Sequence, residues 1–187
     1  MPSATRTIMG VDPGTRRTGW GVVRQSRNGL SYHAGGTIAT KLKAEMADRL
    51  ATIFNELSVA IVDNDPDVVV IEESFGGVNP KTAIVLGQAR GVAMVAAHQA
   101  GRSIVEYTPR AVKKAVVGSG RADKSQVQYM IKSMLLLPEI PESEDEADAL
   151  ALAICHANAG SSSEEPIGDT RAPTKGQQQL KALGLIK

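Results

Sequence analysis

The sequence predicts a single α/β domain in which a mixed, five-stranded sheet carries helices on both faces. The first observation is the order of the patterns, because three β-like runs open the chain and helical and β-like runs alternate after them. The second is size, since 187 residues correspond to one domain and a tail. The third is composition: hydrophobic residues make up 42% of the chain, which is enough to bury a core.

The first three strands follow from apolar runs and turn residues. Ile8 to Val11 is apolar and leads into the turn sequence Asp12-Pro13-Gly14. A second β-like run covers Gly19 to Val23, and a third covers Leu30 to Ala39. Asn28-Gly29 lies between these two runs, which is typical of a hairpin, so we expect three antiparallel strands.

The rest of the domain alternates helices and strands. Leu42 to Val62 has apolar residues at i, i+3 and i+4 spacing, which predicts an amphipathic helix. Val68 to Ile71 is a short unbroken apolar run, as expected of a strand covered on both faces, and Ser103 to Tyr107 is a second short strand. We expect the remaining helices at Thr82 to Ala97, Arg110 to Val117, Lys124 to Leu136 and Asp145 to Ala157.

The composition changes near the end of the chain. Residues 160–179 are rich in Ser, Glu, Pro, Gly and Gln and contain one large apolar residue, Ile167. Such a segment cannot bury enough surface to offset its ordering entropy. We therefore expect a folded domain over residues 1–159 and a disordered tail over residues 160–187.

Several classes of protein are excluded by composition. Cys155 is the single cysteine, which excludes an internal disulfide framework and a Cys-based zinc knuckle. No apolar run approaches the roughly 18 residues that a membrane span requires. Residues 1–9 lack the apolar stretch of a secretory signal. We expect a soluble, cytoplasmic protein with no membrane partner.

The charged residues are segregated although the formal net charge is only +1. Between Arg102 and Lys132, seven Lys and Arg residues accompany two acidic residues. The next stretch, up to Asp148, holds six acidic residues and no basic one. A solvated face normally mixes charges of both signs. The pattern favours a surface that binds a polyanion beside a site that binds a cation, with plain surface segregation as the alternative.

Four acidic residues are candidates for a metal site. Asp12 and Glu72 each close a predicted strand, so they emerge at the same edge of the sheet if those strands are neighbours. Asp145 and Asp148 are three residues apart on a predicted helix and share one of its faces. Mg²⁺ prefers oxygen ligands, and a pair of Mg²⁺ ions suits phosphodiester hydrolysis.

These residues also have ordinary structural interpretations. An Asp before Pro-Gly is often only a turn residue, and Glu72 could end its strand in solvent. Asp145 and Asp148 could instead complement a helix dipole. A shift of one residue in the strand would exchange Glu72 for Glu73. Two further acids lie close enough in sequence to be confused with ligands, Glu144 and Glu146.

Seven sequence blocks between residues 8 and 157 carry a resemblance to a known family. The blocks are Ile8 to Gly14, Thr18 to Val23, Val70 to Phe75, Leu86 to Ala93, Val112-Lys113, Val117 to Val127 and Asp145 to Ala151. Together they resemble RuvC, the family of bacterial Holliday-junction (crossover junction) endodeoxyribonucleases. The blocks occur in the family's order, and as a set they are highly specific.

The resemblance implies a ribonuclease-H-like fold and a homodimer that places two Mg²⁺-dependent sites on a four-way DNA junction. The family's four catalytic acids correspond to Asp12, Glu72, Asp145 and Asp148, which would hold two Mg²⁺ ions per subunit, with Mn²⁺ as a substitute. The family usually has Ala where this chain has Glu146. Because Glu146 lies about 100° round the helix from Asp145, we expect it to point away from the site.

The resemblance also assigns roles to basic and aromatic residues. Lys113 and Lys124 match positions that support DNA binding and catalysis, and we expect Lys124 to be catalytic. Phe75 matches an aromatic residue that contacts DNA bases near the junction. The alternatives are ordinary solvated lysines and a core phenylalanine. We expect contacts with DNA phosphates from Arg110, Lys114 and Arg121.

A stripe of small residues, Ala83, Gly87 and Gly91, recurs every four residues on one predicted helix face. Such a stripe lets another element approach closely. The family resemblance favours a dimer interface there, and packing on the chain's own sheet is the alternative. His156 lies near a helix end and is interpreted as structural, although it could approach the acidic site.

Three other functions compete with the endonuclease. Smaller YqgF-type nucleases of the same fold act on ribosomal RNA, but they lack the Phe75 region and the basic block from Lys113 to Lys124. A sugar or acetate kinase-like ATPase needs a second lobe, and no Gly-x-x-x-x-Gly-Lys-Ser/Thr loop is present. The intact acids argue against a non-catalytic junction binder. We therefore predict a structure-selective endonuclease that resolves four-way DNA junctions, leaves ligatable 5′-phosphate and 3′-hydroxyl ends and works with the RuvA–RuvB branch-migration complex.

Overall fold

A mixed sheet forms the centre of the computed structural model, which describes residues 5–73 and 79–160; the expected tail at 161–187 lies outside this range. β1, β2 and β3 pair antiparallel, whereas β1, β4 and β5 pair parallel, as the predicted mixed sheet requires. Within the described range the strand order is β3-β2-β1-β4-β5. The strands are β1 (Arg6–Asp12), β2 (Arg17–Ser26), β3 (Gly29–Ala39), β4 (Val68–Glu72) and β5 (Ser103–Tyr107).

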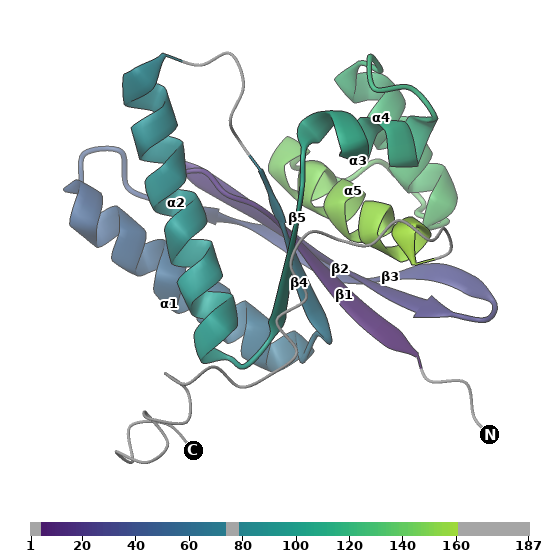
Figure 1. Cartoon of the computed structure of the whole chain (residues 1–187), viewed down its shortest axis with the longest axis horizontal. Helices are drawn as coiled ribbons and strands as arrows, with labels where there is room; N and C mark the ends of the chain where they lie inside the picture. The colour runs from purple at the N-terminus through teal and green to yellow at the C-terminus, as the bar shows by residue number, and fades with distance from the viewer. Residues whose placement is uncertain (1–4, 74–78, 161–187) are drawn as a thin grey trace.

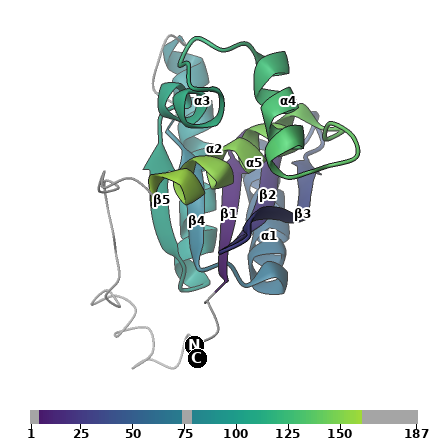
Figure 2. The same ribbon diagram turned by 90° about the vertical axis from the view of Figure 1, so that its right-hand side faces the viewer.

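Helices cover both faces of this sheet (Figures 1 and 2). α1 (Met46–Asn64) and α2 (Pro80–Gln99) pack together on one face, and α5 (Glu144–Ala159) crosses the other. α3 (Pro109–Val117) and α4 (Lys124–Met134) pack against α5 on the side of that second face. Among the described helices, none is both long and apolar enough to cross a membrane.

Side chains alternate across β1 and β4, so that each strand contributes to two cores. Ile8 and Val70 belong to the core between the sheet and α3, α4 and α5. Met9 and Val69 belong to the core under α1 and α2. Because both strands are covered on both faces, β1 from Ile8 to Val11 and β4 from Val68 to Ile71 carry no polar side chain, and each strand changes to an acidic residue where it ends.

The close approach of α5 to the sheet depends on glycines in β1 and β2. A Cβ atom on Gly10 would overlap the carbonyl oxygen of Ala149, and one on Gly19 would overlap the carbonyl oxygen of Asp145. The backbone of α5 therefore rests directly on these strands. On its sheet side α5 buries Leu150 in the core. The first turn of α5 is thereby positioned over the start of β2.

Most helix ends differ from the predicted ends by a few residues, and three of these differences are the most informative. α1 begins at Met46 rather than at Leu42, whose side chain is largely exposed. α2 begins two residues early because the side chain of Asn79 accepts a hydrogen bond at its N-terminus. α4 ends at Met134, and Leu136 beyond it has a φ of 53°, which is incompatible with a continued right-handed helix.

Candidate active site

β1 and β4 bring Asp12 and Glu72 to one edge of the sheet. The two strands are parallel neighbours in which Val11 lies opposite Ile71, and each carboxylate is the next residue of its strand. Since Val11 and Ile71 belong to the core under α1 and α2, alternation directs Asp12 and Glu72 to the opposite face, which α5 covers. The strands are thus neighbours, as the predicted site requires.

The same register distinguishes Glu72 from Glu73. The backbone N–H of Glu73 donates to the carbonyl of Tyr107 in β5 (N···O 2.9 Å). Arg90 of α2 donates from Nε and Nη2 to the two carboxylate oxygens of Glu106, at 2.6 and 2.8 Å. The hydrogen bond that Arg90 donates to Glu106 raises the pKa of Arg90, and the charge of Glu73 adds to that effect. The charge of Glu73 therefore interacts with Arg90 of α2, whereas the side chain of Glu72 lies with the other acids on the face that α5 covers.

α5 supplies the other two predicted acids. Asp145 lies in its first turn, over Gly19, and Asp148 lies one turn further along. Their side chains are partly exposed, with 29% and 33% of the side-chain surface accessible. The charges of both residues act on Asp12. The structure thus brings the four sequence-predicted acids together from β1, β4 and α5.

The electrostatics of these acids reflect burial and crowding of negative charge. Burial, followed by the charges of Glu72, Asp148 and Asp145, raises the pKa of Asp12 to about 7. Burial and the charge of Asp148 raise the pKa of Glu72, and burial raises that of Asp148. The raised pKa of Asp12 thus reflects burial first and the three neighbouring carboxylates second. A bound cation would offset the negative charge of these carboxylates.

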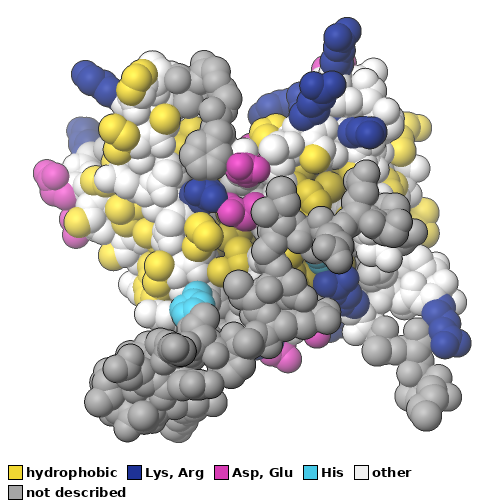
Figure 3. Space-filling model, viewed as in Figure 1, with side chains coloured by type: hydrophobic (Ala, Val, Ile, Leu, Met, Phe, Trp, Pro, Cys, Tyr) yellow, Lys and Arg dark blue, Asp and Glu magenta, His cyan; other side chains and the backbone are white. Residues whose placement is uncertain are grey.

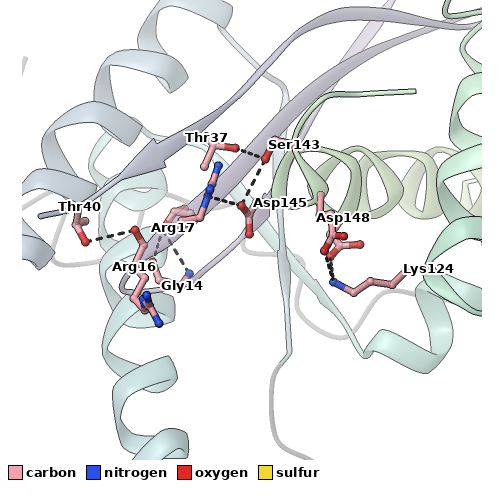
Figure 4. Close-up of polar contacts among 11 residues, drawn as sticks. Gly14, Arg16, Arg17, Thr37, Thr40, Lys124, Ser143, Asp145 and Asp148 are labelled. Carbon is pink, nitrogen blue, oxygen red and sulfur yellow. Dashed lines mark hydrogen bonds and ion pairs between the residues drawn. The ribbon is translucent and has the colours of Figure 1, made fainter. Parts of the chain in front are cut away.

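Two lysines face the acids from α3 and α4. Lys124 Nζ lies 3.2 Å from Glu144 Oε2 and 3.6 Å from Asp148 Oδ2, and Figure 4 shows it reaching from α4 towards Asp148. The charges of Lys113 and Lys124 oppose the upward shift in the pKa of Glu72. The helical block that the sequence analysis associated with DNA thus borders the acidic cluster.

Arg17 is a functional candidate that the sequence analysis missed. It opens β2, and its Nε atom lies 2.8 Å from Asp145 Oδ2 (Figure 4). The available signal was the pair Arg16-Arg17 in the short connection after Asp12. A turn that returns the chain antiparallel to β1 also returns these residues towards the sheet edge that carries Asp12.

The donor set suits a hard divalent cation, because all four acids offer carboxylate oxygens. Among residues 5–73 and 79–160, however, no three His, Cys, Asp or Glu side chains are arranged so that they could hold a metal ion. Asp145 is paired with Arg17, and Asp148 is paired with Lys124. The backbone brings the predicted ligands to one place, and metal binding would require their side chains to rearrange. Their role as metal ligands stays a prediction.

Two other residues considered from the sequence lie away from the acids. Glu146 accepts a hydrogen bond from Tyr32 OH of β3 (3.1 Å), so it points away from the cluster as expected. His156, at the opposite end of α5, is buried within 2.8 Å of Arg6 Nη2 and 3.0 Å of Tyr107 OH. Burial and the charge of Arg6 lower the pKa of His156 to about 4. His156 is therefore a neutral structural residue.

The predicted phosphate-contacting residues remain available at the surface. Lys and Arg side chains gather over α3 and α4 in Figure 3. Arg110, Lys114 and Arg121 are exposed in this region of the chain. Phe75 lies outside the described residues.

A groove of about 530 Å³ runs between α1 and α2 and includes Gly87 and Gly91. A Cβ atom built on either glycine would meet no neighbouring side chain or packed element of the described residues within 4 Å, which argues against packing of these two glycines on the sheet; their place in a dimer interface stays a prediction. The buried stripe of α2 consists of Ala89, Ala93, Ala96 and Ala97. Ala83 is not among the residues that line the groove.

Comparison with known proteins gives consistent matches. The family model described as "Crossover junction endodeoxyribonuclease RuvC" matches residues 8–156. Proteins of that name from Colwellia psychrerythraea and Azorhizobium caulinodans are each 49% identical, over 156 and 151 residues; the matches cover 83% and 81% of this chain and 89% of each relative.

Solved structures extend the comparison to the fold. T. thermophilus RuvC in complex with a Holliday junction substrate superposes with a TM-score of 0.80 at 30% identity, covering 87% of this chain and 99% of that one. The yeast mitochondrial Holliday junction resolvase Ydc2 superposes with a TM-score of 0.60 at 12% identity, covering 82% and 80% of the two chains, and supports the fold alone. The predicted ribonuclease-H-like fold is confirmed.

Proposed function

The chain belongs to the RuvC family of crossover junction endodeoxyribonucleases, and we propose that it resolves four-way (Holliday) DNA junctions in recombination and repair by paired, symmetric hydrolysis of phosphodiester bonds. The observation that carries the proposal is the convergence of Asp12, Glu72, Asp145 and Asp148 from β1, β4 and α5. These are the acids that match the family's catalytic positions. The products are nicks with 5′-phosphate and 3′-hydroxyl ends, which a ligase can seal.

The four acids are the proposed ligands of two Mg²⁺ ions per subunit, with Mn²⁺ as a substitute. Their oxygen donors and the raised pKa of Asp12 support this assignment. When bound, the ions would supply an activated water and stabilise the leaving oxygen. The carboxylates must be ionised to act as ligands, so the proton that Asp12 retains near neutral pH has to leave on loading.

Lys124 is the proposed catalytic cation of the chain itself. The hydrogen bond to Glu144 and the charge of Asp148 raise the pKa of Lys124, so its ammonium stays protonated beside the acids. From there it can offset the charge that develops on the scissile phosphate. Lys113 presents a second positive charge towards Glu72.

The surface over α3 and α4 is proposed to bind the junction arms. Positive side chains on this surface would neutralise phosphates, which makes binding dependent on salt. Phe75 is proposed to stack on a base near the junction. The proposed phosphate contacts come from Arg110, Lys113, Lys114, Arg121 and Lys124.

A homodimer is the proposed active form, since two symmetric nicks require two sites. The groove beside Gly87 and Gly91 supports α2 as the interface, because its apolar wall is open and the glycines leave space for a partner helix. We assign Ala83 to the same interface from its spacing. The proposed cellular context is the cytoplasm, with the RuvA–RuvB branch-migration complex as a partner.

A cleavage assay on three labelled substrates tests the proposed function. The wild-type protein should nick a synthetic four-way junction in opposed strands in Mg²⁺ and not in EDTA, and ligase should reseal the products. Linear duplex and single-stranded RNA should stay intact. Preferential cleavage of the RNA would support the YqgF-like alternative and contradict the proposal, as would equal cleavage of the linear duplex.

A further inference from the structure

Arg17 is held over the acidic cluster by the geometry of β2. Residues 17, 19 and 21 of this strand share one face, because side chains alternate along a strand. A Cβ on Gly19 or Gly21 would clash with α5, which identifies this face as the one that α5 covers. Arg17 is therefore the first side chain of β2 that projects beside the N-terminal turn of α5, where it meets Asp145.

The Asp145 carboxylate is contacted by two neutralising or hydrogen-bonding groups at the same oxygen. Arg17 Nε lies 2.8 Å from Oδ2, and Ser143 Oγ lies 3.4 Å from it. Ser143 Oγ is itself 2.6 Å from Thr37 Oγ1 of β3. Figure 4 draws this contact beside Asp145. Asp145 is thus paired with groups at the β2 and β3 side of the site.

The ion pair between Arg17 and Asp145 is weak enough for another cation to replace Arg17. The Arg17 side chain is 60% exposed, and a solvent-exposed ion pair is weak, so breaking it requires little free energy. In this structure, no three acidic, His or Cys side chains of the described residues are arranged to hold a metal, and Asp145, a proposed ligand, is paired with Arg17. A divalent cation that binds several carboxylates at once would compete with this single exposed guanidinium for Asp145.

We propose that Arg17 is a positioning residue that occupies Asp145 in the metal-free protein and is exchanged for a divalent cation when the active site is loaded. This inference rests on the proposed function, because it takes Asp145 as a metal ligand. Arg17 and the metal compete for one carboxylate. Before a metal binds, Arg17 compensates the charge of Asp145. Because this ion pair has to break, the free energy of metal binding is less favourable by the free energy of the ion pair.

Arg17→Gln and Arg16→Gln form a matched pair of variants. Each removes one positive charge from the same connection, but the Arg16 guanidinium points away from Asp145 and forms no ion pair among the described residues (Figure 4). Isothermal titration with Mg²⁺ should give a Kd about two- to fivefold lower for Arg17→Gln than for Arg16→Gln, the range expected from losing an exposed ion pair. In EDTA, Arg17→Gln should lower Tm by about 1–3 °C relative to Arg16→Gln.

A double-mutant comparison separates this exchange from a purely structural role. In an Asp145→Asn background, Arg17→Gln and Arg16→Gln should have the same Tm in EDTA. In saturating Mg²⁺, the deficit in Tm of Arg17→Gln should disappear, because the metal has replaced the ion pair. A structural role would leave the deficit unchanged on addition of Mg²⁺.

The outcomes distinguish failure of this inference from failure of the proposed function. If the wild-type protein binds Mg²⁺ and cleaves the junction but Arg17→Gln has the same Mg²⁺ Kd as Arg16→Gln, or a higher one, the exchange is overturned and the proposed function stands. If the wild-type protein neither binds Mg²⁺ nor cleaves the junction, both are overturned.

Discussion

Asp12 and Glu72 lie side by side at the ends of parallel strands, one residue beyond the facing pair Val11 and Ile71. The sheet therefore fixes two carboxylates on one face by backbone pairing alone, without a contribution from loops. This arrangement raises the pKa of Asp12 to about 7, and burial and the charge of Glu72 are the two largest causes. Burying one carboxylate beside another is unfavourable unless a cation compensates their charges, so such a pair is expected at a cation-binding site.

Asp12→Asn should abolish cleavage of a four-way junction in Mg²⁺ and leave junction binding largely intact. The amide keeps the shape of the side chain but removes a charged ligand, whereas DNA affinity depends on the positive surface over α3 and α4. Single-turnover cleavage and gel-shift titration measure the two properties. Cleavage at the wild-type rate by this variant would remove Asp12 from the mechanism.

The same variant should stabilise the metal-free protein at high pH. The pKa of Asp12 is 3.8 when unfolded and about 7 when folded, so the folded chain retains a proton between these values that the unfolded chain releases. The unfolding free energy therefore falls as pH rises from about 4 to 7, by about 1.4 kcal/mol per unit. Above pH 7 Asp12 is ionised in both states, and the full free-energy cost of burying its charge lowers the stability of the folded protein.

Urea denaturation in EDTA measures this effect. Asp12→Asn should raise the unfolding free energy by about 2–4 kcal/mol at pH 8 and by about 1 kcal/mol or less at pH 4.5. Asp48→Asn, on the exposed side of α1, is the control and should change little at either pH. A loss of stability at pH 8, or the same gain at both values, would argue against a charge penalty at Asp12.

Lys124→Ala should slow the chemical step by about a hundredfold, the scale of losing one well-placed group that stabilises developing charge. Lys132→Ala is a matched control, because Lys132 lies in the last turn of the same helix. Single-turnover rates at saturating protein separate this effect from weaker DNA binding. An unchanged rate for Lys124→Ala would make Lys124 an ordinary solvated lysine.

Gly87→Leu should convert the proposed dimer into a folded monomer. A Cβ atom at this position meets no packed neighbour within 4 Å among the described residues, so the fold should tolerate the change, whereas a partner helix in the groove should not. Light scattering after size exclusion gives the mass, and far-UV circular dichroism monitors the fold. Gln99→Leu, near the end of α2, is the control. A Gly87→Leu protein that stays dimeric would place the interface elsewhere.

Local sequence patterns were sufficient for most of the fold. The Asn28-Gly29 turn, the unbroken run of β4 and the helical spacing of α1 each depend on neighbouring residues, and each element appears where it was expected. The predicted acids converge because strand ends and helix faces follow from the same patterns. The departures lie at the ends of elements: Leu42 and Leu136 fall outside their predicted helices, and β2 extends beyond its predicted range at both ends.

Contacts between segments that are distant in the sequence could not be predicted from local patterns. Glu72 and Glu73 are successive residues, so their side chains are expected on opposite faces of the sheet. Only the register of β4 against β1 shows which of the two lies beside Asp12. The ion pair of Arg17 with Asp145 joins residues 128 positions apart, and no periodicity signals it. The groove beside Gly87 depends on how α1 packs against α2. These features depend on tertiary packing rather than on local pattern.

Anomalous diffraction from crystals grown with Mn²⁺ locates the bound ion independently of activity. We expect Mn²⁺ density among the carboxylates of Asp12, Glu72, Asp145 and Asp148, with Asp145 released from Arg17. Mn²⁺ bound elsewhere, with these four side chains uncoordinated, would contradict it.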